Sequence, residues 1–320
     1  MQRAVKARKL PSPGQVVLWI VFFTLTLTMI VPLLNILARS LSSPTESIRM
    51  GGLAIFPRDF SLVNYRLVLS HQVLFRSLLN SVWITVMGTL INILLTTCAA
   101  YALTRPKLPG KGAMMAFLIV MMLFEPGLVP EYLLIKDVGL MGSQWSVILM
   151  GSVNVYYLVI MMRYFEEVPS SIIEAAHIDG AGHLRMLLHI CLPLSKAGVA
   201  TIAMFYAVLR WNEYFRASIY IMDRMKTTLQ VILRQFVVLN DTVAIIGAQN
   251  LLNYNEIAKL DYGAVQSATI VVAILPILLL YPIVLKYYTK DIMGGGVKEQ
   301  VARIAPHRGT PSFPRSPDTF

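Results

Sequence analysis

Long apolar runs separated by short polar segments dominate the chain. Six of them approach or exceed the roughly 20 residues that an α-helix needs to cross a bilayer. They cover residues 15–38, 74–103, 112–135, 145–162, 194–220 and 265–287. Backbone polar groups must be satisfied internally in lipid, so each run predicts a helix; the short alternating segments of a membrane barrel are absent. The pattern therefore predicts an all-α integral membrane protein with six transmembrane helices.

Composition supports this class. The chain has 320 residues, of which 56% are hydrophobic and 14% charged, whereas soluble domains carry about 25% charged residues. Lysine and arginine are spread over loops and termini, so the net charge of +11 suggests anionic lipid and not nucleic acid. No cleavable secretory signal is evident, because the first apolar run is too long and lacks a cleavage site. We expect Cys98 and Cys191 to be reduced thiols.

The spans divide the chain into three parts. Residues 1–14 form a short basic segment, residues 15–290 the six-span domain, and residues 291–320 a tail that we expect to be flexible. An even number of spans places both termini on one side. The basic turn 105–111 shares that side and marks it as cytoplasmic. The longer outer segments, 39–73 and 221–264, are too short to form a domain of their own.

A few polar residues lie within the spans. Glu125 and Glu131 flank proline and glycine residues in the third span, which predicts a broken or kinked helix. Ionisable groups at membrane depth usually face a bundle interior or a cavity. The alternative is that both glutamates lie at the membrane interface, and the sequence leaves this open. Asn92, in the second span, more often makes an interhelical hydrogen bond than a substrate contact.

One polar stretch interrupts the apolar pattern, EAAHIDGAGHLRMLLHICLP at 174–193. Ser171 and Glu174 match a capping box, so a helix can begin at Ser171, and Gly180 can end it. A second short helix can follow before Pro193 opens the fifth span. A lipid-surface helix would want basic and bulky apolar residues. The first helix carries acids and alanines instead, which favours docking to another protein.

Three histidines in this stretch invite a metal hypothesis. His177, His183 and His189 are spaced by six residues, which on one helix turns each about 240° from the last. No common face results, and the spacing of a helical zinc motif is absent. We therefore predict no metal site, and the polar loops offer no recognisable catalytic constellation.

This stretch and several other segments of the chain resemble a known family. Glu174-Ala175-Ala176, then Gly180, Ile190 and Leu192-Pro193, resemble without a gap the EAA loop of ABC-importer permeases. FSLVNYRLVL (60–69), LVPEYLLIKDVGL (128–140), RWNEYFRASIYIMD (210–223) and MGGGVKE (293–299) resemble the carbohydrate subgroup. The likeness covers roughly residues 10 to 300. It is to the maltose-transporter type with six spans and no large periplasmic insert, and within that type to alginate and aldouronate importers.

Three positions depart from the family pattern. Leu187 stands where many EAA loops have an aromatic residue, and Ala197 where many have proline. Glu125-Pro126 replaces what is commonly a pair of small residues. The first two changes would alter the packing of the loop only mildly. The third makes the substrate path harder to assign.

The resemblance implies a type I ABC importer permease fold in which the EAA loop, about 170–193, is a cytoplasmic coupling helix docked on an ATPase. Glu174 would meet a basic group of the ATPase, Ala175 and Ala176 would allow close contact, and Gly180 would form the turn. Asp179, which is also usual before the glycine, offers a further charge to the partner. Capping and docking remain rival roles for Glu174. Candidates for lining the translocation pathway are Asn92, Glu125, Trp211 and Asn212.

Partners follow from the same resemblance. They are a second permease chain, an ATPase dimer that holds ATP and Mg²⁺, a periplasmic or extracellular solute-binding protein, and a saccharide, in the inner (plasma) membrane. No phosphate-binding G-x-x-x-x-G-K-[ST] motif occurs, so the chain is not expected to be an enzyme itself. A self-contained secondary transporter is the rival hypothesis, but it would normally show internal repeats, and none is visible. A membrane enzyme would need a catalytic constellation.

The outer segments hold more lysine and arginine than aspartate and glutamate. Such a surplus would concentrate an anionic solute near the mouth of the pathway. The alternative is that these cations meet acidic patches on the binding protein. The resemblance to alginate importers favours an acidic oligo- or polysaccharide.

Overall fold

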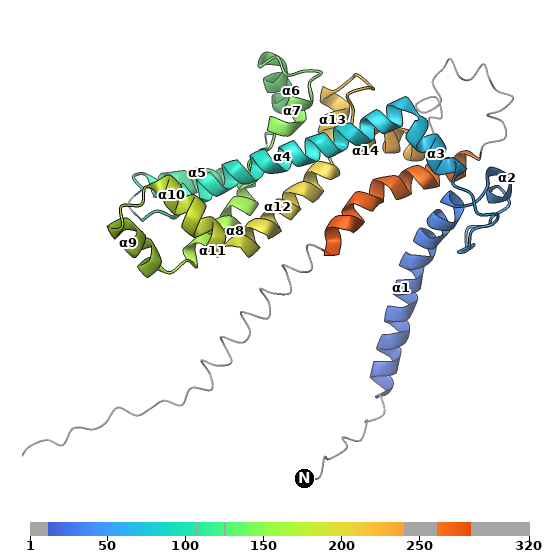
Figure 1. Ribbon diagram of the computed structural model, residues 1–320, viewed down its shortest axis with the longest axis horizontal. Helices are drawn as coiled ribbons and strands as arrows, with labels where there is room; N and C mark the ends of the chain where they lie inside the picture. The colour runs from blue at the N-terminus through green and yellow to red at the C-terminus, as the bar shows by residue number, and fades with distance from the viewer. Residues whose placement is uncertain (1–11, 107, 125, 240–260, 283–320) are drawn as a thin grey trace, which may run out of the picture.

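The computed structural model describes residues 12–106, 108–124, 126–239 and 261–282, and these residues fold into helices joined by short loops (Figure 1). The longer helices are α1 (Pro13–Ser40), α4 (Gln72–Thr104), α5 (Lys111–Leu123), α6 (Leu128–Asp137), α8 (Val155–Glu166), α12 (Lys196–Trp211) and a helix at Tyr262–Pro282. The shorter ones are α2 (Pro44–Ser47), α3 (Val63–Ser70), α7 (Gln144–Leu149), α9 (Ser170–Ile178), α10 (His183–Met186), α11 (Leu192–Leu194), α13 (Phe215–Tyr220) and α14 (Leu229–Leu233). Two π-helical segments lie at Leu187–Cys191 and Arg234–Val238.

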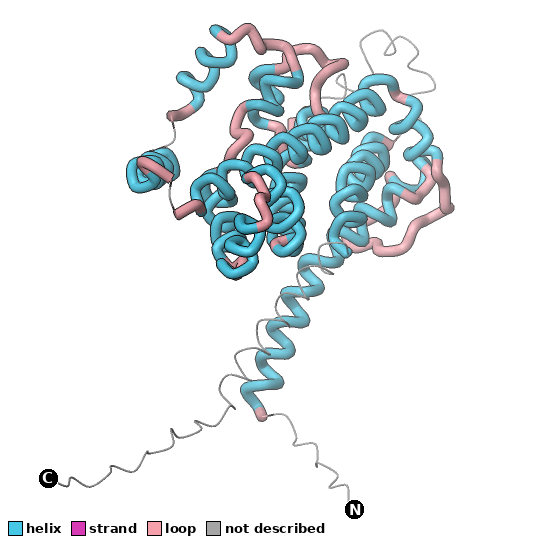
Figure 2. The backbone as a smooth tube through the Cα atoms, turned by 60° about the vertical axis from the view of Figure 1, so that its left-hand side comes forward, coloured by secondary structure: helices cyan, strands magenta, loops and turns pink. Residues whose placement is uncertain are grey.

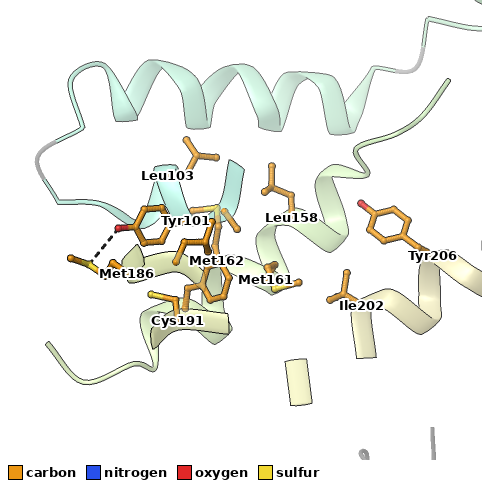
Figure 3. Packing of buried hydrophobic residues seen from close by; sticks show 12 residues of the cluster. Tyr101, Leu103, Leu158, Met161, Met162, Met186, Cys191, Ile202 and Tyr206 are labelled. Carbon is orange, nitrogen blue, oxygen red and sulfur yellow. Dashed lines mark hydrogen bonds between the residues drawn. The ribbon is translucent and has the colours of Figure 1, made fainter. Parts of the chain in front are cut away.

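Helix α4 is the axis of the molecule. It runs the length of the bundle in Figure 1, with α8 and α12 packed against it. Leu74 near its first turn, Ile84 in the middle and Tyr101 near its end belong to three separate buried clusters. The cluster around Tyr101, drawn in Figure 3, joins α4 to α8, α12 and the segment 183–194. One long helix thus connects the parts of the bundle.

Helix α1 projects away from the other helices (Figure 2). Its apolar stretch is exposed throughout, and only its last turns are buried. There Asn35 Nδ2 donates to the carbonyls of Gly51 (3.0 Å) and Ala54 (2.7 Å), and Asn64 Nδ2 donates to that of Ser40 (3.1 Å). Asn35 therefore fixes α1 to the 41–62 loop, and Asn64 fixes α3 to the end of α1. Among the described residues, no other helix covers the apolar stretch of α1.

The number of described helices that could cross a membrane agrees only in part with the six predicted spans. Helix α1, helix α4 and the helix Tyr262–Pro282 are long and apolar enough to cross a membrane. Two bent pairs could each count as one more span: α5 with α6, at 114°, and His183–Leu194 with Lys196–Trp211, at 88°. The break predicted in the third span is therefore present, with Gly127 at a positive φ of 80° directly before α6.

Two predicted spans need correction. The fourth, 145–162, is not one helix: α7 ends at Leu149 and α8 begins at Val155. Gly151 has a positive φ of 67°, which an α-helix does not allow, and Asn154 caps α8 through Tyr157 N at 3.2 Å. The fifth, 194–220, ends as α12 at Trp211 and resumes as α13 at Phe215.

Helix α1 begins earlier than predicted, at Pro13. Ser12 Oγ accepts from Gln15 N at 3.4 Å, and Ser12 N donates to Gln15 Oε1 at 2.9 Å, which forms a capping box. Pro13 occupies the first helical position, where its missing N–H needs no partner. The local sequence SPGQ therefore sets the start of this helix.

Candidate functional site

The polar stretch at 170–194 forms a helix, a glycine turn and a second helical segment. Helix α9 ends in a Schellman motif: Ala181 N donates to Ala176 O at 2.9 Å and Gly180 N to His177 O at 3.1 Å. Gly180 has a φ of +74°, so the prediction that it ends this helix is confirmed. Nothing lies within 4 Å of the position that a Cβ would occupy there. Glycine is thus required by the backbone and not by close packing.

The start of α9 differs from the prediction. The helix begins at Ser170, with Pro169 at the N-cap position and no side-chain hydrogen bond to the first turn. The capping box proposed for Ser171 and Glu174 is therefore wrong. A proline at the cap lacks a side-chain acceptor, and the shift by one residue moves Ser171 inside the helix. Glu174 is exposed and makes no described hydrogen bond or ion pair, so its carboxylate is free of a capping role.

The exposed face of α9 combines apolar and acidic groups. Ile178 is 87% exposed, an unusual position for a branched apolar side chain, and Glu174, Ala175 and Asp179 are also exposed. Ala176 is buried, at 8% exposure, which corrects the expectation that it would contact a partner. The face available to a second protein is therefore Glu174, Ala175, Ile178 and Asp179, and Ala176 faces the chain itself.

The second segment packs into the bundle. Met186 and Cys191 are fully buried in the cluster of Figure 3. The Tyr101 hydroxyl of α4 lies 3.1 Å from His183 Nδ1 and 3.4 Å from Met186 Sδ, and the guanidinium of Arg105 lies 4.3 Å from the centroid of the Tyr101 ring. Burial raises the pKa of the Cys191 thiol, an effect that the nearby Arg105 opposes. These contacts fix the loop to the end of α4.

The two histidines nearest the turn meet, contrary to the expectation for one continuous helix. The rings of His177 and His183 lie 6.1 Å apart, centroid to centroid, edge to face. The turn at Gly180 interrupts the helix and so removes the 240° relation between them. Among the described residues, no group of three or more histidine, cysteine, aspartate or glutamate side chains is placed to hold a metal ion.

The pathway candidates separate in space. Asn212, at the end of α12, lines an open cavity of about 580 Å³ together with Tyr157, Met204, Phe205, Val208, Leu209, Glu213, Tyr214 and Phe215. Trp211 is not among its lining residues: it is 4% exposed and donates from Nε1 to Ala273 O at 3.0 Å, which joins α12 to the helix Tyr262–Pro282. Asn92 is fully buried between helices. Glu125 lies outside the described residues.

Glu131 is neither a lone charge in the bundle nor simply solvated. Its carboxylate accepts from Arg216 Nε at 3.2 Å and Nη2 at 3.3 Å, and from the Tyr220 hydroxyl at 3.3 Å. Arg216 also donates to Glu213 Oε2 at 3.4 Å. This network joins α6 to α13 beside the cavity. Within it, the carboxylate of Glu213 is paired with the guanidinium of Arg216.

A buried cation escaped prediction. Arg210, near the end of α12, is 1% exposed and has no ionic partner within salt-bridge distance among the described side chains. It donates to Asn92 Oδ1 at 3.0 Å and to the carbonyls of Val147 and Ile148 in the last turn of α7. An arginine inside a predicted span is itself a sign of a buried cation that pairs with polar groups of neighbouring helices. Arg210 lies in the predicted span 194–220, but no role was predicted for it from the sequence.

Residues 81–293 match the family described as binding-protein-dependent transport system inner membrane component. This segment contains most of α4, from residue 81 onward, together with the 170–194 loop, α12 and the cavity residues.

Individual relatives agree with the family match. The polygalacturonan/rhamnogalacturonan transport system permease protein YtcP of Bacillus subtilis is 36% identical over 278 residues, 85% of this chain and 93% of that protein. Protein LplC of the same organism is 37% identical, over 84% of this chain and 89% of that protein. One solved structure, of a bacterial ABC transporter involved in the import of the acidic polysaccharide alginate, superposes with a TM-score of 0.78 at 28% identity, covering 88% of this chain and 99% of that one.

Proposed function

Because the chain belongs to the family of inner-membrane components of binding-protein-dependent transport systems, we propose that it is the permease of an importer for acidic oligo- or polysaccharides. It is a permease of the saccharide ABC-importer type and not itself a catalytic subunit. The observation that carries the substrate class is the joint likeness to a polygalacturonan/rhamnogalacturonan permease and to an alginate importer. All three polysaccharides named there contain uronic acids.

The 170–194 loop is the coupling element in this proposal. Its exposed face presents Glu174, Ala175, Ile178 and Asp179 to a cytoplasmic ATPase dimer, which would hold ATP and Mg²⁺. An 87% exposed isoleucine flanked by acids suits a partner surface with an apolar pocket and basic rim. The loop is also fixed to α4 through His183 and Met186 and continues directly into α12. Movement of a docked ATPase would therefore reach two long helices.

The cavity beside Asn212 is the proposed point of contact with the saccharide. Tyr157, Phe205, Tyr214 and Phe215 supply flat apolar surfaces, which suit the C–H faces of sugar rings, and Asn212 supplies an amide for hydroxyl groups. The carboxylate of Glu213 is paired with Arg216, so its charge is partly compensated. Asn92 and Trp211 are proposed to act through packing, because both are buried away from this cavity.

The assembly follows from the family. We propose six spans with both termini on the ATPase side, a second homologous permease, and a solute-binding protein at the opposite face. The exposed apolar surface of α1 would lie against lipid or against that second permease. Both alternatives explain why no helix in the described part of the chain covers this surface.

The test is purification of the tagged chain from its native membrane in mild detergent, followed by reconstitution. The proposal expects a complex with an ATPase and a second permease. In vesicles with the binding protein, oligogalacturonate and oligoalginate should stimulate ATP hydrolysis more than a neutral malto-oligosaccharide of equal length. Equal stimulation would remove the acidic substrate. Transport by the chain without any ATPase would favour a secondary transporter and overturn the coupling role.

A further inference from the structure

Four polar side chains form a clamp, which we define as Asn92 and Thr96 of α4 with Tyr206 and Arg210 of α12. Each pair is spaced by four residues, so each lies on one face of its helix. Arg210 Nη2 donates to Asn92 Oδ1 at 3.0 Å, and the hydroxyls of Thr96 and Tyr206 lie 2.8 Å apart. All four side chains are fully buried or nearly so. The clamp therefore joins α4 and α12 at two levels.

The same two residues of α12 also hold the break between α7 and α8. Arg210 Nη1 donates to Val147 O at 2.6 Å and to Met150 O at 3.2 Å, while Nη2 donates to Ile148 O at 3.0 Å and to Gly151 O at 3.2 Å. At the other side of the break, Asn154 N donates to the Tyr206 hydroxyl at 3.0 Å. One helix thus satisfies carbonyls left by the end of α7 and an N–H left by the start of α8.

The physical need for these contacts is clear. A helix that ends leaves its last carbonyls without intrahelical donors, and a helix that begins leaves its first N–H groups without acceptors. Within a membrane, water is not present to replace them. The partial negative charge at the end of α7 also favours a cation there. A guanidinium offers several N–H groups in a fixed fork, so one arginine reaches carbonyls on both sides of Leu149.

The packing makes room for this arginine. A Cβ added to Gly88 of α4 would lie 3.1 Å from Arg210 Cδ and Nε, so the absence of a side chain at position 88 lets the guanidinium stem pass. Near the other end of α12, Gly198 packs directly on the ring of Tyr164 in α8, and Ser195 Oγ donates to Tyr164 O at 3.1 Å. Helices α8 and α12 are therefore joined from the loop end to the break.

We propose that Arg210 is a positioning residue for transport, which makes the α7–α8 break move with α12. This inference rests on the proposed function, since α12 begins where the coupling loop ends. When the ATPases move the loop, α12 follows, and the clamp carries the break at the remote end with it. The side chain is 1% exposed, so it acts through the backbone of the break and not on the saccharide.

The experiment measures saccharide transported per ATP hydrolysed in vesicles that hold the whole transporter with its binding protein. Arg210→Met removes the donors, Arg210→Lys retains the charge without the fork, and Tyr206→Phe removes only the hydroxyl. Thr201→Val is the matched control, because its lost hydrogen bond, to Ala197 O at 2.9 Å, lies within α12. We expect Arg210→Met to keep ATP hydrolysis while transport per ATP falls about tenfold or more, with Arg210→Lys intermediate. Unchanged transport per ATP in Arg210→Met would overturn the inference.

A second measurement needs no change at Arg210. In a background with Cys98→Ala and Cys191→Ala, spin labels at Leu149→Cys and Leu209→Cys report the distance between α7 and α12. Labels at Phe22→Cys and Leu209→Cys report movement of α12 against α1. Between nucleotide-free and ATP-trapped states, the first distance should change by less than about 2 Å and the second by more. A larger change in the first distance, or none in the second, overturns the inference. If the purified transporter contained no ATPase, the proposed function would be overturned instead.

Discussion

The hydroxyl of Tyr101 in α4 lies 3.1 Å from Nδ1 of His183 in the loop that follows α9. The two residues are far apart in the sequence, and this hydrogen bond is a direct polar connection between the loop and the longest helix. Tyr101 also lies within 3.4 Å of Met186 Sδ, so one side chain holds two positions of the same segment. The loop is consequently attached to α4 as well as to α12.

Replacing Tyr101 with phenylalanine keeps the ring in its cluster and removes both contacts of the hydroxyl. A hydrogen bond of this kind contributes about 0.5–1.5 kcal/mol, so the chain should fold. We expect the loop to open more often, with faster hydrogen exchange at residues 183–191 and lower uptake per ATP. Tyr156→Phe, at an exposed position of α8, is the control. Identical exchange in both variants would contradict the attachment.

Gly180→Val changes the turn and nothing around it. A branched residue at φ +74° is strained by roughly 1–2 kcal/mol, and no neighbour lies within 4 Å of the added Cβ. The strain should change the direction of the second helical segment. The amount of the variant in the membrane should stay the same, while uptake per ATP falls severalfold. Gly182→Val is the matched control, since Gly182 has a φ of −69° and an equally open environment. Equal uptake in the two variants would show that the turn is not needed.

Gly198→Ala tests the contact between α12 and α8. The added Cβ would lie 2.3 Å from the ring carbon Cγ of Tyr164, so a helix or the ring must shift. Overpacking of this kind costs about 1–3 kcal/mol, and the apparent unfolding temperature of the purified complex should fall by several degrees. Gly112→Ala, with open space around it, should not lower it. Adding Tyr164→Leu to Gly198→Ala should restore part of the loss.

Cys191 reports the packing of the loop through its reactivity. Burial raises the pKa of its thiol, and the thiolate is the reactive form. In a Cys98→Ala chain, the rate of maleimide labelling should be slow, and its rise with pH should have its midpoint above about 8.5, the midpoint of an ordinary thiol. After unfolding in detergent, the midpoint should return to that of an ordinary thiol. A native profile that already has the midpoint of an ordinary thiol would show that the segment is not packed.

The sequence pattern predicts long uninterrupted helices better than broken ones. The limits of α1 and α4 lie within two residues of the predicted spans, because a long apolar run has only one low-energy form in a bilayer. The break between α7 and α8 was not predicted. Its apolar residues continue the run, and the groups that stabilise it, Arg210 and Tyr206, come from a distant part of the chain.

In the 170–194 loop, the local sequence likewise predicts some features and misses others. Gly180 was predicted as a helix end because the turn needs a positive φ that the local sequence reveals. The capping box at Ser171 was wrong because Pro169 sets the start one residue earlier, whereas the same rule applied to Ser12 and Gln15 would have found the true start of α1. The burial of Ala176, at 8% exposure, depends on tertiary packing, which local sequence does not contain.

A photo-crosslinking residue placed at position 178 tests whether the exposed face of α9 docks on an ATPase. Ile178 is 87% exposed, and Met222, 79% exposed beyond α13, is the matched control position. In native membranes, position 178 should form an adduct with the ATPase, identified by mass spectrometry, and position 222 should not. Adducts with the ATPase from position 222, or none from position 178, would contradict the claim.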